Sequence, residues 1–170
     1  MTDALRRWNR HTPREALQEV LPCCGSRTWA AELVKRRPLA DRATLLAASD
    51  EIWQNLTASD WLEAFRSHPR IGESRPSQTA SAQSAAWSSQ EQQKVADAND
   101  AVKIALADAN RVYEDRFGYI FIVCASGKSG PEILEILQRR LHNDKNAELH
   151  EAAEQQRQIT QIRLNRWLSE

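Results

Sequence analysis

The chain has 170 residues, of which 41% are hydrophobic, and a chain of this size can bury the core of one domain. Lys and Arg number 23, as do Asp and Glu, so the formal net charge is zero and there is no basic excess of the kind that nucleic-acid binders carry. No apolar run is long enough to cross a bilayer, and we predict a single domain over residues 1–170 that binds neither nucleic acid nor membrane.

The cysteines favour a reducing compartment. They are three in number, Cys23, Cys24 and Cys124, and the adjacent pair is poorly placed to form a disulfide. Reduced thiols are typical of a cytosol, where disulfides are rare. The N-terminus shows no secretory signal, and Leu168–Glu170 is not a peroxisomal address. We expect a cytoplasmic protein.

No residue pattern points to a cofactor. The four histidines are scattered, and no Cys or His spacing resembles a metal site. There are only five glycines, and they form no phosphate-binding loop. We therefore expect no metal, nucleotide or flavin.

Three helices are predicted near the N-terminus from their start and stop signals. The first runs from the capping residue Thr12 to its stop at Pro22. The second runs from a cap at Ser26 to Pro38, and the third opens at Asp41. Short, locally connected helices of this kind indicate an all-helical fold.

The next helix is predicted to stop at a histidine. Its apolar face consists of three residues at helical spacing: Trp61, Leu62 and Phe65. Ser59 or Asp60 can cap its start. Pro69 pushes the preceding residue, His68, out of the helical region, and Gly72 then allows a turn. A histidine held in this way is suited to proton transfer, whereas the alternative is a surface histidine favoured by the helix dipole.

Residues 74–89 are rich in Ser, Gln, Thr and Ala and poor in apolar residues, so we predict a mobile surface segment with some weak helix, or a plain linker. Ser88 is then predicted to open the longest helix, which runs to Arg116 along an apolar stripe. Ser88 and Glu91 have capping-box spacing, in which each side chain satisfies the other's backbone amide. The free amides of the same helix end could instead hold an anion.

The run from Phe117 to Ala125 is continuously apolar, β-branched or aromatic, and predicts a buried extended segment. Without a partner strand its backbone groups need other partners, of which a ligand could be one. A helix opens at Ser129, and a last helix runs from Ala147 to Trp167 with its charged side chains expected in solvent. The sequence therefore predicts an all-α fold, a single compact multi-helix domain with one buried extended segment.

One motif resembles a known family. His68-Pro69-Arg70-Ile71-Gly72-Glu73 is similar to the signature of 2-oxo-4-hydroxy-4-carboxy-5-ureidoimidazoline (OHCU) decarboxylases, in the form typical of bacterial members. Ser88-x-x-Glu91-Gln92, the Phe-Gly-x-x-Phe-x-x-Cys-Ala pattern of residues 117–125 and an arginine between apolar neighbours, Arg163, also fit. The motifs are specific in combination and weak singly: alone, the second is a helix cap, and Arg163 is typical of an amphipathic surface.

The resemblance implies a carboxy-lyase of urate breakdown that converts OHCU to (S)-allantoin and carbon dioxide. The substrate's carboxylate sits next to a C=N bond, so the substrate carries its own electron sink and no cofactor is implied. The resemblance implies His68 as general acid/base, Glu91 as the group that holds the substrate and orients His68, and a homodimer. It implies further substrate contacts at Pro69, Ser88, Ser89, Gln90, Gln92, Phe121, Ile122, Val123, Cys124, Ala125 and Arg163.

Two other classes of function stay open at this point. One is a non-catalytic helical interaction module, in which the motifs act only as helix caps and stops. The other is a cofactor-free enzyme of the same fold that acts on a related ureido acid.

Overall fold

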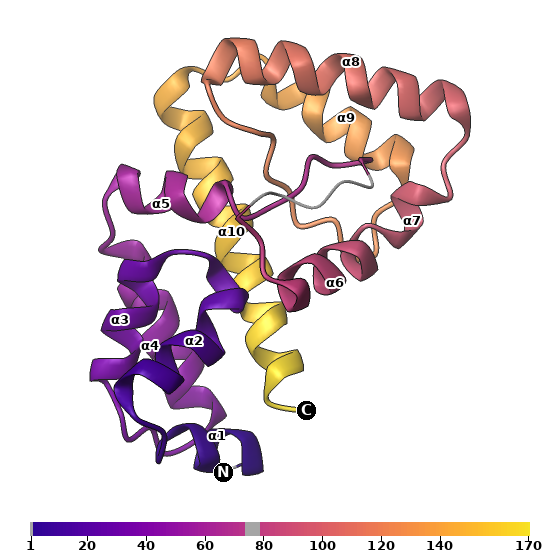
Figure 1. Cartoon of the computed structure of the whole chain (residues 1–170). Coiled ribbons are helices and arrows are strands. Elements are labelled where there is room, and N and C mark those ends of the chain that lie inside the picture. Colours follow the sequence, from indigo (N-terminus) through magenta and orange to yellow (C-terminus); the bar gives the residue numbers. More distant parts are fainter. Residues whose placement is uncertain (1, 74–78) are drawn as a thin grey trace. The chain divides into compact units, whose positions relative to one another are not determined.

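The structure, a computed structural model, describes residues 2–73 and 79–170. Within these ranges every regular element is a helix, which confirms the predicted all-α class. In chain order (Figure 1) the helices are α1 (Asp3–Trp8), α2 (Pro13–Cys24), α3 (Arg27–Lys35), α4 (Arg42–Gln54), α5 (Ala58–Phe65), α6 (Ala82–Glu91), α7 (Gln93–Ala96), α8 (Asp100–Phe117), α9 (Gly130–Arg140) and α10 (Lys145–Trp167). None of these helices is long and apolar enough to cross a membrane.

The chain divides into two units, one made of Met1–Ala64 with Arg157–Glu170 and the other of Phe65–Gln156. In the first unit α2 packs against α3, and α3 packs against α4. Each of these helices begins at a side chain that accepts a hydrogen bond from the backbone amide three residues on. The predicted caps that are confirmed here are Thr12, Ser26 and Asp41.

The predicted stop of α2 at Pro22 is wrong, because the helix continues to Cys24. Proline removes one backbone donor and crowds the preceding turn, but little of the helix remains to be disturbed so close to its end. The helix ends instead at Gly25, whose φ of 89° is left-handed and whose N–H donates to the Leu21 carbonyl at 2.8 Å. The continuation buries Cys23 and Cys24, and burial raises the pKa of the Cys24 thiol to about 12.

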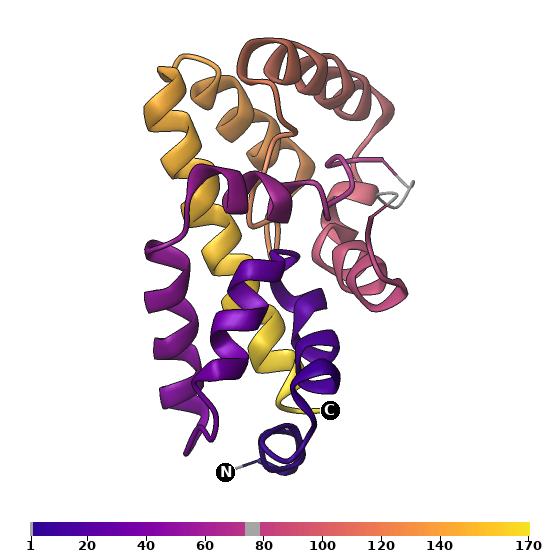
Figure 2. The ribbon, with the colours of Figure 1, turned by 60° about the vertical axis from the view of Figure 1, so that its left-hand side comes forward.

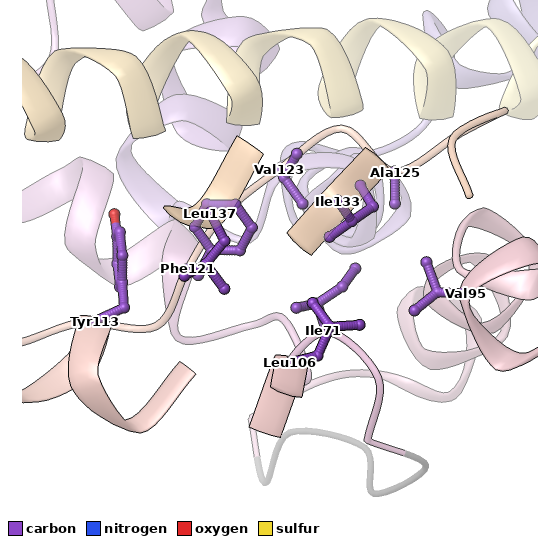
Figure 3. Packing of buried hydrophobic residues seen from close by; sticks show 9 residues of the cluster. All are labelled: Ile71, Val95, Leu106, Tyr113, Phe121, Val123, Ala125, Ile133 and Leu137. Carbon is purple, nitrogen blue, oxygen red and sulfur yellow. The ribbon is translucent and has the colours of Figure 1, made fainter. Parts of the chain in front are cut away.

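The core of the second unit forms around α8 and α9, which pack side by side (Figure 1; Figure 2). Figure 3 shows the buried cluster that they share with α7 and the loops: Ile71, Val95, Leu106, Tyr113, Phe121, Val123, Ala125, Ile133 and Leu137. The Tyr113 and Phe121 rings meet edge to face, with centroids 5.2 Å apart. A Cβ on Gly130 would lie 2.6 Å from the Ala98 Cβ, so the glycine lets the start of α9 approach the α7–α8 link.

The helix predicted to open at Ser88 begins earlier and is interrupted. Ser81 caps α6, α7 follows directly, and Asn99 caps α8, so Ser88 lies near the end of a helix rather than at its start. The predicted Ser88–Glu91 capping box is therefore wrong. The weak helix predicted within residues 74–89 is confirmed by α6, but the predicted surface position is wrong at Trp87 and Ser88, which are buried. Residues 74–78 of that prediction lie outside the described residues.

The predicted buried segment is confirmed, although it is shorter than expected because Phe117 still belongs to α8. Residues 121–125 form neither helix nor strand, and none of their side chains is more than 6% exposed. Side chains supply partners for the backbone: Arg140 Nη1 donates to the Ile122 carbonyl at 2.7 Å, and Lys128 Nζ donates to the Cys124 carbonyl at 2.8 Å. The backbone groups that lack a neighbouring strand are thus bonded in part by long polar side chains.

The first turns of α10 carry a buried charge, so the expectation that its charged residues are solvated is wrong. Glu148 is 0% exposed, and its Oε1 accepts from Arg140 Nε at 2.8 Å and from Nη2 at 2.5 Å. Asn143 and the Tyr113 hydroxyl also donate to this carboxylate. Burial and the hydrogen bond to Glu148 raise the pKa of Tyr113, so its hydroxyl stays protonated.

Candidate active site

His68 lies in a turn that follows α5 and not at the end of the helix itself. The helix ends at Phe65, and the His68 N–H donates to the Phe65 carbonyl at 3.1 Å, so the predicted helix end is wrong. The predicted cap at Ser59 or Asp60 is wrong as well. Thr57 is the cap, because its Oγ1 accepts the Asp60 N–H at 3.4 Å while the Asp60 carboxylate accepts the Thr57 N–H at 3.0 Å.

The His68 side chain is buried and bonded. It is 9% exposed, and its Nε2 lies 2.6 Å from Oε1 of Gln156, a residue of α10 that is 0% exposed. An amide oxygen can only accept a hydrogen bond, so Nε2 carries the hydrogen and Nδ1 is the basic nitrogen of the neutral ring. A buried, hydrogen-bonded imidazole does not fit the alternative of a surface histidine.

The loop that follows His68 is held by α8. Arg70 pairs with Glu114 through Nε at 2.5 Å and Nη2 at 2.9 Å, and this pairing raises the pKa of the guanidinium. Asn110 Nδ2 donates to the Ile71 carbonyl at 3.1 Å, and the Ile71 side chain is buried in the core cluster. The ion pair of Arg70 and the hydrogen bond to the Ile71 carbonyl hold the loop in place, and they also fix the backbone next to His68.

The end of α6 reaches the same loop. Gln92 Oε1 accepts the N–H of Gly72, whose φ is 82°, at 3.0 Å. Ser88 is 2% exposed, whereas Ser89 and Gln90 are exposed. The hydrogen bond between Gly72 and Gln92 therefore connects the motif that begins at His68 with the motif that begins at Ser88. The sequence spacing alone could not predict this contact.

Glu91 acts on the buried segment through its charge. Burial raises the pKa of the Cys124 thiol, the Lys128 charge and the Ser126 backbone lower it, and the Glu91 carboxylate makes the smallest of these contributions by raising it. An effect of this kind requires Glu91 and Lys128 to lie near Cys124. Glu91 is thus within the range of a charge interaction with Cys124, whereas Lys128 contacts the Cys124 carbonyl directly at 2.8 Å.

Two neighbouring glutamines of α10 were not predicted as site residues. Gln156 binds His68, and Gln155 Oε1 accepts the Cys124 N–H at 2.9 Å. A glutamine in a polar helical stretch is typical of a solvated face, so no local signal marks either residue. Their contacts tie His68 and the buried segment to one helix turn.

Arg163 belongs to the unit that contains the two termini and is described there by itself. It is 0% exposed, and its Nη1 donates to the Pro22 carbonyl at 3.2 Å, so it is not the amphipathic surface residue that its local sequence indicates. The same unit has a surface depression of about 560 Å³ lined by Asp3, Arg6, Arg7, Arg10, His11, Thr12 and Glu15. None of these lining residues belongs to the predicted site.

A sequence model of the OHCU decarboxylase family matches residues 9–165. The chain belongs to the OHCU decarboxylase family. The match includes every predicted site residue from His68 to Arg163. Within residues 2–73 and 79–170, no three His, Cys, Asp or Glu side chains lie together in a way that could hold a metal ion.

Curated relatives support the same family. The chain is 36% identical over 149 residues to the uric acid degradation bifunctional protein TTL of Arabidopsis thaliana, with 87% of this chain and 46% of that protein covered. It is 28% identical over 141 residues to a uric acid degradation bifunctional protein of Bacillus sp. (strain TB-90), with 81% and 26% covered. The chain thus spans about half, or less, of the length of these two bifunctional relatives. The 2-oxo-4-hydroxy-4-carboxy-5-ureidoimidazoline decarboxylase of Amia calva is 31% identical over 136 residues, with 79% and 77% covered.

Solved structures share the fold. A crystal structure of OHCU decarboxylase in the presence of (S)-allantoin superposes with a TM-score of 0.77 at 33% identity, covering 89% of this chain and 98% of that chain. A crystal structure of (S)-allantoin synthase superposes with a TM-score of 0.72 over 96% of this chain and 53% of that chain. The second structure is 20% identical and shows the fold alone.

Proposed function

We propose that the protein is a carboxy-lyase that converts OHCU to (S)-allantoin and carbon dioxide. The observation that carries the proposal is the buried His68, bonded through Nε2 to Gln156 and placed at the start of the family's His-Pro motif. The similar OHCU decarboxylase crystallised in the presence of (S)-allantoin is covered by this chain over 98% of its length. That coverage supports an activity carried by the decarboxylase part alone.

In this reaction the protein has to orient the substrate and transfer protons. The bond from the ring carbon to the carboxylate breaks, carbon dioxide leaves, and the electron pair flows into the adjacent C=N bond. A C=C bond then joins the two ring carbons, and the former imine nitrogen takes up a proton. The hydroxyl loses its proton as its carbon becomes a carbonyl, and the former imine carbon, which carries the ureido group, takes up a proton whose direction of delivery sets the stereocentre. Because the substrate is its own electron sink, we propose that no cofactor is needed and that His68 is the general acid/base.

We propose that Glu91 holds the substrate and that the buried segment adds main-chain contacts. Val123 supports this role, since its amide and carbonyl have no hydrogen-bond partner within residues 2–73 and 79–170. The carbonyl of Ile122 and both main-chain groups of Cys124 are already bonded to Arg140, Gln155 and Lys128. The remaining proposed contacts are those of the sequence prediction: Pro69, Ser88, Ser89, Gln90, Gln92, Phe121, Ala125 and Arg163.

A coupled assay tests the activity. Urate oxidase and hydroxyisourate hydrolase generate OHCU from urate, and circular dichroism follows (S)-allantoin. We expect the protein to accelerate formation of the (S) enantiomer above the spontaneous reaction, before and after exhaustive EDTA treatment. A trace identical to that without the protein would refute the activity, and activity that returns only with added metal would refute the cofactor-free mechanism.

The two alternatives give different results in the same experiment. A non-catalytic interaction module neither turns over OHCU nor binds (S)-allantoin. An enzyme for a related ureido acid binds (S)-allantoin, as calorimetry would measure, but does not turn over OHCU.

We also propose a homodimer of single-domain subunits, each spanning residues 1–170, in the cytoplasm. Two large hydrophobic side chains on α8 support a dimer, because Ile104 is 63% exposed and Val112 is 55% exposed. The family match over residues 9–165 supports a single domain. Three buried cysteines that form no disulfide support a reducing compartment.

A further inference from the structure

The strongest unassigned feature of the second unit is the contact between Gln156 and His68. Gln156 lies within α10, where a glutamine side chain normally extends into water, yet it is 0% exposed. Burying an amide is costly unless it is hydrogen-bonded. Its oxygen lies 2.6 Å from His68 Nε2, so the buried amide and the buried imidazole satisfy one another.

The chemistry of an amide partner differs from that of a carboxylate. A carboxylate next to a histidine favours the charged imidazolium and raises its pKa. An amide oxygen accepts the Nε2 hydrogen without adding a negative charge. It therefore selects the tautomer with hydrogen on Nε2 and leaves Nδ1 as the nitrogen that can take up or release a proton.

Gln155, the residue before Gln156, gives α10 a second contact with the proposed site. Gln155 Oε1 accepts the Cys124 N–H at 2.9 Å, and its Nε2 donates to Glu151 one turn earlier at 3.1 Å. Successive residues of a helix point about 100° apart, so the two amides serve different partners. Gln155 holds the buried segment, while Gln156 holds the histidine.

We propose that Gln156 is a positioning residue that fixes the orientation and the Nε2–H tautomer of His68, so that Nδ1 performs the proton transfer. The proposal rests on the proposed function, in which His68 is the general acid/base. Gln156 itself need not touch the substrate, and it acts through the ring that it holds.

Two substitutions separate this role from a merely structural one. Gln156→Met keeps the length of the side chain and removes the acceptor. Gln156→Glu keeps the acceptor and adds a charge. Gln155→Met is the matched control, because it removes the neighbouring amide, which contacts Cys124 and not His68.

The readouts are the ¹⁵N chemical shifts of the His68 ring, assigned by their loss in His68→Asn, and the pH dependence of kcat. We expect Nε2–H in the wild type and in Gln155→Met, a mixture of tautomers in Gln156→Met, and a raised His68 pKa in Gln156→Glu. Loss of the orienting partner should lower kcat by about 10–100-fold, the range known for partners that orient metal-bound histidines. Gln156→Glu should retain the tautomer and shift the acidic limb of the pH–rate profile to higher pH.

Two results would overturn the proposal. One is an Nδ1–H tautomer in the wild type, and the other is a folded Gln156→Met protein with an unchanged tautomer and an unchanged pH profile. Failure of the proposed function is separable, because the ring shifts do not depend on turnover. A wild type with the Nε2–H tautomer but no OHCU turnover would contradict the catalytic role of His68 and leave the positioning by Gln156 in place.

Discussion

At the scale of single residues, the site depends on polar groups that are buried and paired. His68 and Gln156 are hydrogen-bonded to each other, and Arg140 and Glu148 form a buried ion pair. Each pair contains one group that would be costly to bury alone. A substitution that removes one member of such a pair leaves the other member buried without its partner, so its effect can be predicted.

The first prediction concerns His68 and Glu91 as the proposed proton-transfer and substrate-holding groups. His68→Asn keeps some hydrogen-bonding capacity but cannot transfer a proton near neutral pH, so kcat should fall by about 10²–10⁴-fold. Glu91→Gln keeps the shape and removes the charge, and it should reduce kcat less. The measurements are kcat in the coupled assay, with the spontaneous rate subtracted, and the melting temperature of each variant.

Matched controls for this prediction are His142→Asn and Glu135→Gln, which make the same changes at exposed positions. Both controls should retain wild-type kcat. A folded His68→Asn protein with wild-type kcat would end the proposal that this residue moves the proton.

The second prediction concerns the buried carboxylate of Glu148. It accepts hydrogen bonds from Arg140, Asn143 and Tyr113, and both it and Arg140 are at most 1% exposed. Glu148→Leu would leave the guanidinium buried without its counter-charge, so the free energy of unfolding should fall by about 3–5 kcal/mol. The measurement is urea denaturation.

The double variant Arg140→Met with Glu148→Leu provides the control, since it removes both charges together. It should recover much of the stability that Glu148→Leu loses. A Glu148→Leu protein that loses less than about 1 kcal/mol, the range of an exposed ion pair, would show that the pair is solvated in solution.

At the scale of elements, the local start signals were the best predictors. The helix starts predicted at Thr12 and Ser129 are confirmed. A capping box involves four consecutive residues and needs no distant partner, so it can be predicted from the local sequence. The helix start predicted at Ser88 is wrong, although Ser88 and Glu91 have the spacing of a capping box. Trp87 and Ser88 are buried, and this burial keeps the stretch inside α6. Local chemistry cannot choose between two possible starts when tertiary packing decides.

The third prediction tests that corrected helix start. Ser81 accepts the Ser84 N–H at 3.1 Å as the cap of α6. Ser81→Ala should lower the free energy of unfolding by about 1 kcal/mol. Ser89→Ala is the control, because Ser89 is exposed within the last turn of the same helix and should change stability little. Equal losses from the two variants would contradict the assignment of Ser81 as the cap.

At the scale of the whole molecule, the proposed site in the second unit combines segments that are far apart in sequence. His68 contacts Gln156, Gly72 contacts Gln92, and Cys124 contacts Gln155. The motifs could be found one by one, since each is a short pattern. The amides of α10 could not be predicted in the same way, because their burial depends on which segments pack against the helix.

The last prediction concerns self-association through α8. Ile104 and Val112 lie four residues on either side of Asp108, and Asp100 and Arg116 lie eight residues on either side. An antiparallel pairing of two copies of α8 about Asp108 would therefore set Ile104 against Val112 of the partner subunit and Asp100 against Arg116 of the partner subunit. The order is self-complementary, as a two-fold interface requires, and Asp108, which meets its own copy at the axis, is paired with Arg111 of its own helix at 2.7 Å.

We expect the wild type to sediment as a dimer at micromolar concentration. Ile104→Asp with Val112→Asp should shift it to the monomer, because the substitutions place unpaired charges in the contact. Ala107→Asp, which adds the same kind of charge at another exposed position of α8, is the control and should dissociate the dimer less. A wild type that sediments as a monomer would refute the homodimer, and a double variant that remains dimeric would place the interface on another surface.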